Sequence, residues 1–305
     1  MVLKLLTSAT RSARRIGRRF RRSSIEPPLW ERVLFYLVLG AVLFVSAYPF
    51  YVMATASFAG ATWLDAVPPE FVPDLSDLTL DNYRILFGEG SAPFVDYFLN
   101  SLFIATVSAA LGLLFSIFGA YSFARLEYPG RSLFARGVLV NYMFAGILLV
   151  IPIYQIIVWI DLVNTRTGII LTHFIFVIPL GLYLLGNYFR SIPKEIEEAG
   201  MMDGYSRLEV IVRITIPMSK PAIVATYMYA FLLSWNEYLY AKVFLKDQGL
   251  YTLPIGIESI LNAPAVRNIW GEALAASLIT TIPVLILFLY LQRYLVEGLS
   301  FGSMD

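Results

Sequence analysis

The sequence has little charge for its length and lacks cysteine altogether. Of its 305 residues, 15% are charged and 58% are hydrophobic, and none is cysteine. Without cysteine the chain forms neither a disulfide nor a thiolate metal site. Its single histidine, His173, lies inside an apolar run, so a three-ligand zinc site or a serine–histidine triad has little to build on. No Gly-x-x-x-x-Gly-Lys-Ser/Thr phosphate loop occurs, so any ATP hydrolysis belongs to another chain.

Long apolar runs are what the sequence has in quantity. A bilayer core of roughly 30 Å is crossed by about 20 helical residues. Runs of this kind occur at residues 33–52, 97–124, 137–160, 167–189, 221–241 and 273–292, the fifth of them broken only by Glu237. Together with the composition, they predict an all-α integral membrane protein of the cell membrane with six transmembrane helices. Six crossings place both termini on the same side.

The basic residues indicate which side that is. Residues 1–32 form an arginine-rich tail, which the positive-inside rule places in the cytoplasm together with the C-terminus. The cations that this topology leaves outside are few: Arg84, Arg166, Lys242, Lys246 and Arg267. The tail could also contact anionic lipid headgroups. A cleaved signal peptide ending at Ala54–Ala56 is the alternative, but the apolar run is too long for one.

Residues 191–217 form a polar segment between the fourth and fifth runs. Ser191 and Pro193 suit the start of a short helix, and Gly204 suits its end. Ser206 and Glu209 have the spacing of a capping box, which starts a second helix. Pro217 lacks an amide hydrogen and is expected to interrupt that helix before the fifth run. The segment is therefore predicted to be two helices joined by a turn.

This segment has two interpretations. As a mere connector, it would pack an apolar side under the bundle, namely Ile196, Ala199, Leu208, Ile211 and Val212. A connector needs only a few residues, however. As a docking surface, it would use small residues at the turn to let a soluble partner approach closely.

Resemblance to a family favours the second interpretation. The segment resembles the cytoplasmic signature of binding-protein-dependent ABC importer permeases, in which Glu-Ala-Ala is followed by glycine and then by Ile-x-Leu-Pro. Here Glu198-Ala199-Gly200, Gly204 and Ile214-Thr215-Ile216-Pro217 fall at that spacing, with Gly200 for alanine and Ile216 for leucine. Five further stretches resemble the six-span partner of the maltose-type carbohydrate permeases: residues 100–102, 119–125, 164–165, 235–238 and 292–298. Residues 302–305 depart from the small and basic ending of that subfamily.

The resemblance implies a function, a type I importer permease fold and a set of partners. It implies a permease subunit that imports a sugar with a second permease as a heterodimer, two ATP-binding subunits and an external solute-binding protein. ATP and magnesium would be held by the ATPases, with no cofactor on this chain and no nucleic acid. The residues implied to couple the chain to the ATPase are Glu198, Ala199, Gly200, Asp203, Gly204, Ile214 and Pro217. Glu198 would pair with a basic residue of the ATPase, and Pro217 would fix how the loop joins the fifth span.

Polar residues within the runs are candidates for the substrate pathway. They are Asn141, Gln155, Asn187, Trp235, Asn236 and Glu237. Glu237 is the only acid within a span, and intramembrane charges usually face a cavity. The alternatives are that Glu237 reaches toward water and that the amides bond neighbouring helices. The outer segment 247–270 either reaches the solute-binding protein or is a plain surface loop.

Other functions compete with the sugar permease. An importer permease could carry a polyol or glycerol phosphate instead. An intramembrane enzyme would use Glu237, His173 or Asp161 as acid and base, but these residues fall at different depths. A secondary carrier would be expected to show inverted repeats and several buried carboxylates, which the sequence does not show.

Overall fold

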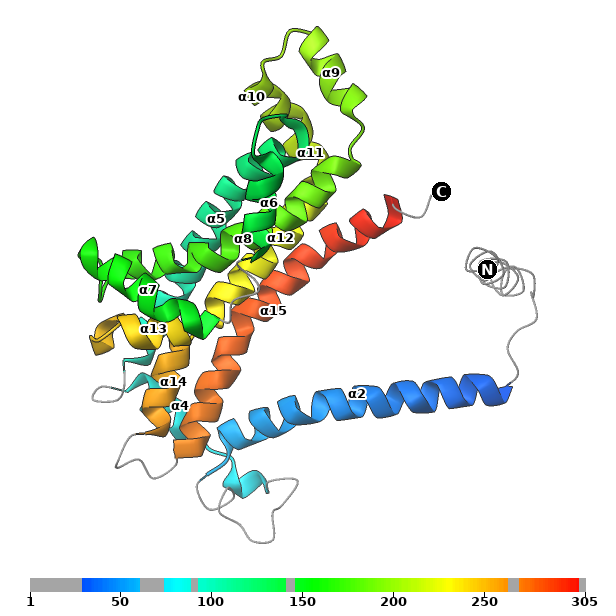
Figure 1. Cartoon of the computed structure of the whole chain (residues 1–305). Helices are drawn as coiled ribbons and strands as arrows, with labels where there is room; N and C mark the ends of the chain where they lie inside the picture. The colour runs from blue at the N-terminus through cyan, green and yellow to red at the C-terminus, as the bar shows by residue number, and fades with distance from the viewer. Residues whose placement is uncertain (1–28, 61–73, 89–92, 141–145, 263–268, 302–305) are drawn as a thin grey trace, which may run out of the picture. The chain divides into compact units, whose positions relative to one another are not determined.

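The computed structural model is helical over the residues that it describes, which are 29–60, 74–88, 93–140, 146–262 and 269–301 (Figure 1). Within these ranges the chain has one isolated bridge, between Ala59 and Leu78, and no strand. The predicted all-α class is confirmed. The chain divides into two compact units, residues 1–52 and residues 53–305.

Four helices are long and apolar enough to cross a membrane. They are α2 (Leu29–Phe58), α5 (Phe94–Arg125), α8 (Arg166–Ser191) and α15 (Ile269–Phe301), the last over its part up to Gln292. Each contains one of the predicted apolar runs and extends it by several residues. The described residues therefore support four of the six predicted spans as single helices.

Two shorter helices contain most of the run that was predicted as the third span. α6 (Arg131–Val140) and α7 (Gly146–Trp159) lie on either side of residues 141–145, which fall outside the described residues. α7 is apolar but, with 14 residues, too short to cross a bilayer by itself.

The run predicted as the fifth span is also divided. α12 (Lys220–Trp235) ends before α13 (Leu239–Phe244), and residues 236–238 between them are not helical. The expectation of one continuous helix over residues 221–241 is wrong. The break coincides with Glu237, the one acid of the run.

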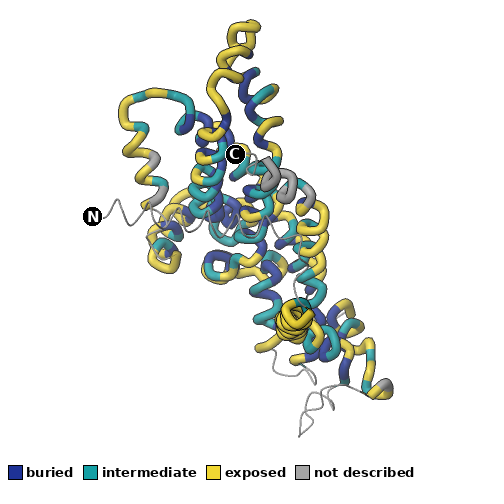
Figure 2. Tube along the Cα trace, turned by 90° about the vertical axis from the view of Figure 1, so that its right-hand side faces the viewer, coloured by how far each residue is buried: buried dark blue, intermediate teal, exposed yellow. Residues whose placement is uncertain are grey.

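The long helices of the second unit pack against one another through small residues. α5 packs along α8 and α12, and α12 packs along α15. At Gly181 on α8 a Cβ atom would overlap the Ser116 side chain on α5. The Ser116 hydroxyl donates to the Gly112 carbonyl of its own helix at 2.6 Å and also lies 3.3 Å from the Ile178 carbonyl on α8. Close approach through glycine, supported by a hydroxyl, is typical of helix pairs in membranes. Figure 2 shows the buried positions concentrated along the meeting helices.

Three clusters of buried apolar residues fill the space between these helices. One joins α5, α12 and α15, the second joins α5, α7, α8 and α13, and the third joins the C-terminal ends of α5 and α8. The members of the third cluster include Ala120, Tyr121, Leu185, Phe189 and Ile211. This third cluster supports the short helices that carry the candidate site.

Short elements lie at the two ends of the second unit (Figure 1). At one end are α9 (Lys194–Met202), α10 (Arg207–Val210), the π-helix η3 (Ile211–Thr215) and α11 (Ile216–Met218). At the other are α4 (Asp81–Phe87), the 3-10 helix η4 (Gln248–Leu250) and α14 (Leu253–Leu261). A 3-10 turn, η1, covers Leu75–Asp77.

Candidate functional site

The segment 191–217, called the two-helix loop below, contains α9 and then α10, with a tight turn between them. Gly204 in this turn has φ of +93°, a left-handed conformation that glycine adopts readily. The predicted capping box is confirmed: Ser206 N–H donates to Glu209 Oε2 at 3.0 Å, and Glu209 N–H donates to Ser206 Oγ at 3.4 Å. The amide and hydroxyl of Ser206 hold the pKa of Glu209 below its ordinary value. The turn is thus fixed by its own residues.

The start of α9 differs from the prediction. Ser191 does not cap it, because Ser191 is the last residue of α8 and its hydroxyl donates to the Tyr188 carbonyl at 2.7 Å. Pro193 occupies the N-cap position instead of the first turn. Ile192 has the extended conformation that a following proline enforces, with φ of −76° and ψ of 128°. A short extended link therefore joins α8 to α9.

The expected interruption at Pro217 is also wrong. The chain stays helical through η3, whose Ile216 N–H donates to the Ile211 carbonyl five residues back, and then through α11 to Ser219. A proline deprives the α-helical ladder of one donor. The π turn just before it widens the ladder, so the helix continues past the proline. The second helix of the two-helix loop consequently runs almost without a break into α12.

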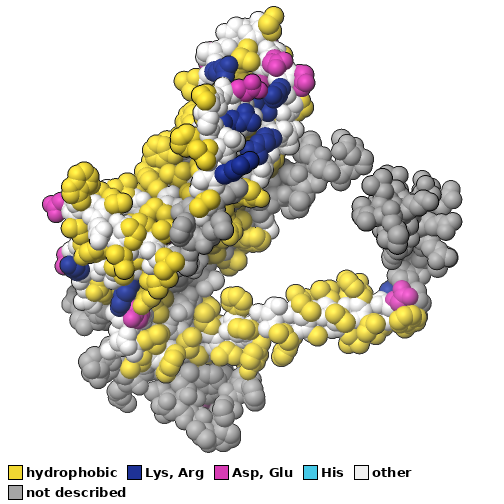
Figure 3. All heavy atoms as spheres, viewed as in Figure 1, with side chains coloured by type: hydrophobic (Ala, Val, Ile, Leu, Met, Phe, Trp, Pro, Cys, Tyr) yellow, Lys and Arg dark blue, Asp and Glu magenta, His cyan; other side chains and the backbone are white. Residues whose placement is uncertain are grey.

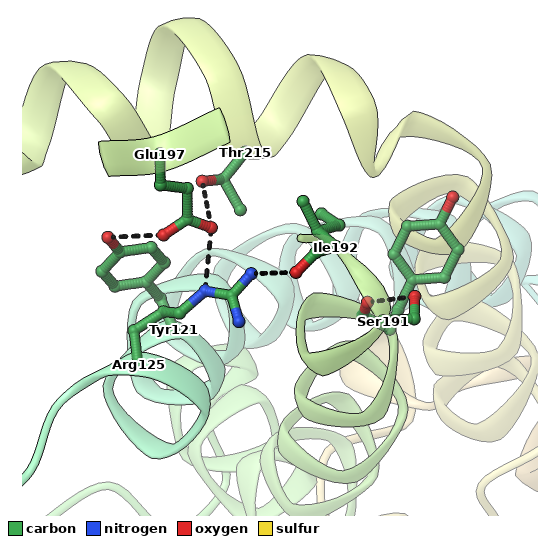
Figure 4. A network of polar contacts seen from close by, with 7 residues as sticks. Tyr121, Arg125, Ser191, Ile192, Glu197 and Thr215 are labelled. Carbon is green, nitrogen blue, oxygen red and sulfur yellow. Dashed lines mark hydrogen bonds and ion pairs between the residues drawn. The ribbon is translucent and has the colours of Figure 1, made fainter. Parts of the chain in front are cut away.

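A buried ion pair connects α9 to the end of α5 (Figure 4). Arg125 Nε lies 2.9 Å from Glu197 Oε1, and the two side chains are only 7% and 4% exposed. The Tyr121 hydroxyl donates to Glu197 Oε2 at 3.2 Å, and the Thr215 hydroxyl donates to Oε1 at 3.4 Å. Arg125 also donates to the Ile192 carbonyl at 2.8 Å. We call this set the Glu197 network.

The sequence-based interpretation missed the Glu197 network and named the neighbouring Glu198 instead. A signal for it was present. Tyr121 and Arg125 are four residues apart at the end of an apolar run, so they share one helix face. A buried arginine at such a place requires an anionic partner. The sequence does not tell which acid of the following loop that partner is.

The residues predicted for ATPase coupling are mostly on the surface. Glu198, Ala199, Asp203, Gly204 and Pro217 are exposed, and Ile214 is half-buried. Gly200 is buried, and a Cβ atom at this position would overlap the Ile214 side chain across the loop. Gly200 therefore lets α9 approach η3 closely, and it does not lie on the outer surface.

The surface of the two-helix loop is mixed in character. Several apolar residues proposed to pack under the bundle are exposed, namely Ile196, Ala199, Leu208 and Val212, whereas Ile211 is buried. Met202 is 88% exposed. Figure 3 shows Lys and Arg side chains gathered at this end of the second unit, next to acids and apolar side chains. The contacts thus do not support a connector with its apolar side turned inward.

Glu237 accepts hydrogen bonds from the first turn of α13. Its two carboxylate oxygens accept the Tyr240 N–H at 2.7 Å and the Ala241 N–H at 3.0 Å, and the side chain is 9% exposed. His173 Nε2 on α8 lies 3.7 Å from Glu237 Oε2, and neither nitrogen of its ring has a hydrogen-bond partner in the described part of the chain. The glutamate thus caps a helix where the fifth run breaks.

The other predicted pathway residues do not form one cluster with Glu237. Trp235 is buried and stacks on Phe231 with ring centroids 5.5 Å apart, while the exposed Asn236 bonds within its own helix, to the Leu232 carbonyl. Gln155 is exposed on α7, and Asn187 is exposed near the end of α8, where it accepts from Arg190 at 3.2 Å. Asn141 lies outside the described residues.

At the opposite end of the second unit, asparagine side chains form hydrogen bonds with the backbone of the segment that follows α13. Asn100 on α5 donates to the Gly249 and Tyr251 carbonyls at 2.9 and 3.1 Å, and Ser101 Oγ accepts the Leu253 N–H at 2.7 Å. Asn164 has φ of +60°, and its Oδ1 accepts the amides of Lys246 and Asp247 at 2.8 and 3.0 Å. The segment 245–253 is thereby held against α5 and the start of α8.

The family described as "Binding-protein-dependent transport system inner membrane component" matches residues 29–300. The chain belongs to this family. It is therefore a multi-pass membrane subunit of a transport system and not an enzyme, and the interpretations as an intramembrane enzyme or a secondary carrier are not supported.

Relatives in this family match nearly the whole chain. The inner membrane ABC transporter permease protein YcjP of Escherichia coli is 38% identical and matches over 90% of this chain and 96% of its own length. The trehalose/maltose transport system permease protein MalG of Thermococcus litoralis is 33% identical over 90% of this chain and 97% of its own. AraQ of Halalkalibacterium halodurans, an arabinooligosaccharides transport system permease protein, is 32% identical over 86% and 92%.

A solved structure shares the fold. A chain of a bacterial ABC transporter involved in the import of the acidic polysaccharide alginate superposes with a TM-score of 0.74 at 23% identity. The match covers 89% of this chain and 99% of that one. At this level of identity the likeness shows that the two chains share a fold, and nothing about the substrate.

Proposed function

We propose that this chain is a permease subunit of an ATP-driven importer that moves a sugar delivered by an external solute-binding protein. The proposal is carried by relatives that match over almost their whole length and are named for trehalose and maltose, arabinooligosaccharides and diacetylchitobiose. A second solved structure with this fold, matched with a TM-score of 0.63 at 16% identity, is of a bacterial alginate ABC transporter in complex with an alginate pentasaccharide-bound periplasmic protein. No specific observation favours a polyol or glycerol phosphate.

In this proposal the chain crosses the membrane six times, with both termini in the cytoplasm. The crossings are α2, α5, α6 with α7, α8, α12 with α13, and α15. The 16 and six residues of α12 and α13 together supply about the length that a bilayer core requires. Arg125, Arg190, Arg207 and Arg213 belong to the end that carries the two-helix loop, which supports a cytoplasmic position for this end.

The two-helix loop would couple the chain to two ATP-binding subunits, which hold ATP and magnesium. Its exposed Glu198, Ala199, Asp203 and Gly204 offer two carboxylates and two small residues to a partner surface. The almost continuous helix from α10 to α12, past Ile214 and Pro217, offers a route for movement into the membrane. ATP shifts the permease between conformations only if it favours one of them differentially. A loop docked on the ATPases would provide that difference.

The pathway and the external partners would lie toward the opposite end. Non-helical backbone at membrane depth is tolerated where it is buried in protein or lines a cavity. The break at residues 236–238 therefore supports a pathway near Trp235, Asn236 and Glu237, shared with a second permease subunit. The segment 247–262, which includes α14, would face the solute-binding protein. Lipid surrounds the remaining apolar surface, and no nucleic acid takes part.

Co-purification tests the assembly. A tagged copy of this chain, expressed with the genes for its transport system, is expected to bring down a second permease and ATP-binding subunits. Glu198→Lys and Gly204→Asp should still reach the membrane but lose the ATPases or substrate-stimulated hydrolysis. Glu195→Lys is the matched control, because Glu195 is also an exposed acid of α9. Normal transport in both signature variants would contradict the coupling role.

Uptake assays test the substrate class. Cells that carry the complete system are offered labelled trehalose, maltose, arabino-oligosaccharide, diacetylchitobiose, glycerol and glycerol phosphate. Uptake of at least one sugar, lost on deletion of this chain, is expected. Uptake of glycerol or glycerol phosphate alone would overturn the sugar assignment and leave the permease assignment intact.

A further inference from the structure

We propose that Glu197 is a positioning residue, which fixes α9 to α5 so that the two-helix loop and the membrane helix move as one body. The inference rests on the proposed function, because it concerns how ATPase movement enters the membrane. It assigns to Glu197 a role distinct from that of Glu198. Neighbouring residues of an α-helix point about 100° apart, and here one of them is buried while the other is exposed.

The Glu197 carboxylate brings together segments that are far apart in sequence. Oε1 accepts from Arg125 on α5 and from Thr215 in η3, and Oε2 accepts from Tyr121 on α5. Arg125 meanwhile donates to the Ile192 carbonyl in the link between α8 and α9. One carboxylate and one guanidinium thus contact both helices of the two-helix loop, the link that precedes α9 and the end of α5.

The link between α8 and α9 makes such a connection necessary. Ile192 and Pro193 are extended residues between two helices, and no helical ladder crosses them. On the other side of the loop, the helix is almost continuous from α10 into α12. Without the Glu197 network, α9 would therefore be connected to α8 only through this extended link, and to α12 only through the turn at Gly204 and α10. Arg125 holds both Ile192 and Glu197, so it spans this link.

The chemistry of the network suits positioning better than stability. A buried ion pair contributes little net stability compared with apolar residues of the same volume, because desolvation offsets its attraction. Its geometry is nevertheless specific, since each bond requires a defined position of its partner. The third apolar cluster already supplies contacts between α5, α8 and Ile211. What the network adds is a fixed orientation of α9 relative to α5.

Distance measurements in the assembled transporter test the proposal. The chain has no native cysteine, so spin labels can be placed at Glu127→Cys, just after α5, and at Met202→Cys, at the end of α9. Both positions are exposed. With the other subunits supplied in cysteine-free form, the label distance is measured without nucleotide and after trapping with Mg-ATP and vanadate. A single narrow distribution that is unchanged by trapping is expected, because α9 and α5 move together.

Glu197→Gln should broaden this distribution and uncouple the transporter. It keeps the shape of the side chain but removes the charge that Arg125 binds. The ATPases should still co-purify, whereas the stimulation of ATP hydrolysis by the purified solute-binding protein should fall about fivefold or more, the order of a typical coupling factor. Glu195→Gln, an exposed acid on the same helix, is the control and should change neither measurement.

The outcomes separate this inference from the proposed function. A narrow distribution and full stimulation in Glu197→Gln would overturn the positioning role while leaving the permease assignment standing. A failure of wild-type chain to bring down any ATPase would overturn the proposed function itself. Should Glu197→Gln not accumulate, Tyr121→Phe removes a single hydrogen bond from the same carboxylate. Its distribution should broaden to a smaller extent, and an unchanged one would count against the proposal.

Discussion

Glu197 and Glu237 are two glutamates with little exposure, and their carboxylates accept hydrogen bonds from different kinds of partner. Glu197 is bound by side chains from α5 and from η3, up to 76 residues away in sequence. Glu237 is bound by the amides of Tyr240 and Ala241, three and four residues further on. His173, 3.7 Å away, makes no hydrogen bond to it in the described residues.

The sequence distance of its partners determines which part of the structure each carboxylate can fix. A side chain held by distant partners fixes the position of whole helices relative to one another. A side chain held by the next turn fixes only where one helix ends and the next begins. Substitution of Glu197 should therefore alter the structure of the whole two-helix loop, whereas substitution of Glu237 should alter only the surroundings of α13.

The largest effect is expected from Arg125→Met. It leaves the Glu197 carboxylate buried without its cation, which costs about 3 to 5 kcal/mol in the free energy of unfolding. Arg84→Met is the matched control, because Arg84 pairs with Asp81 at 3.0 Å on the surface, with side chains 75% and 62% exposed. Water screens such an exposed pair, so it contributes little to the free energy of unfolding. Thermal unfolding in detergent measures the melting temperature of both purified variants. Similar decreases for Arg125→Met and Arg84→Met would contradict the expectation that the buried pair matters more than the exposed one.

A smaller and more local effect is expected from Glu237→Ala. The variant loses the acceptors for two amides of α13, comparable to the loss of a helix cap, at about 1 kcal/mol. Amide hydrogen exchange should rise at Tyr240 and Ala241 and stay unchanged in α9 and α10. Asn236→Ala is the control, since Asn236 is exposed and bonds only to its own helix. Faster exchange throughout the two-helix loop would show that Glu237 acts at long range after all.

The smallest effect is expected at Glu209. Its carboxylate also accepts a hydrogen bond from a backbone amide, but the side chain is exposed to water. The Ser206 amide and hydroxyl lower its pKa in the folded chain. The contribution of this carboxylate to the stability of α10 is therefore complete above the ordinary pKa that glutamate has in the unfolded chain. It is lost as the pH falls through the lower pKa of the folded chain. Exchange of the α10 amides should rise over that acidic range. Glu209→Gln should show no such pH dependence, and an identical profile in both proteins would exclude the capping carboxylate as the cause.

Features that depend on neighbouring residues were predicted well from the sequence. The capping box from Ser206 to Glu209 and the left-handed Gly204 each involve only a few consecutive residues, so residue type determines them. The four long helices also follow from apolar runs, because a helix that satisfies its own backbone is the simplest solution in lipid.

Features that depend on distant partners were missed. Glu197 and Glu198 are adjacent acids, and only Arg125, 72 residues before Glu197, determines which of them turns inward. The break in the fifth run was missed because hydropathy averages over many residues, whereas a single carboxylate captures the amides that follow it. The helix continues past Pro217 because of a π turn, and no local rule for proline predicts one.

The π turn at η3 has a consequence for the relation between α10 and α12. A π turn contains one residue more than the α-helical turn that it replaces. The wider turn takes up this extra residue, so the helices on its two sides keep the rotational phase of an α-helix that is one residue shorter. Deleting one residue between Ile211 and Thr215 would therefore restore an α-helical ladder and leave the exposed face of α10 in nearly the same direction relative to α12. Deleting one residue within the α-helical part of α12 would instead turn everything that follows by about 100°.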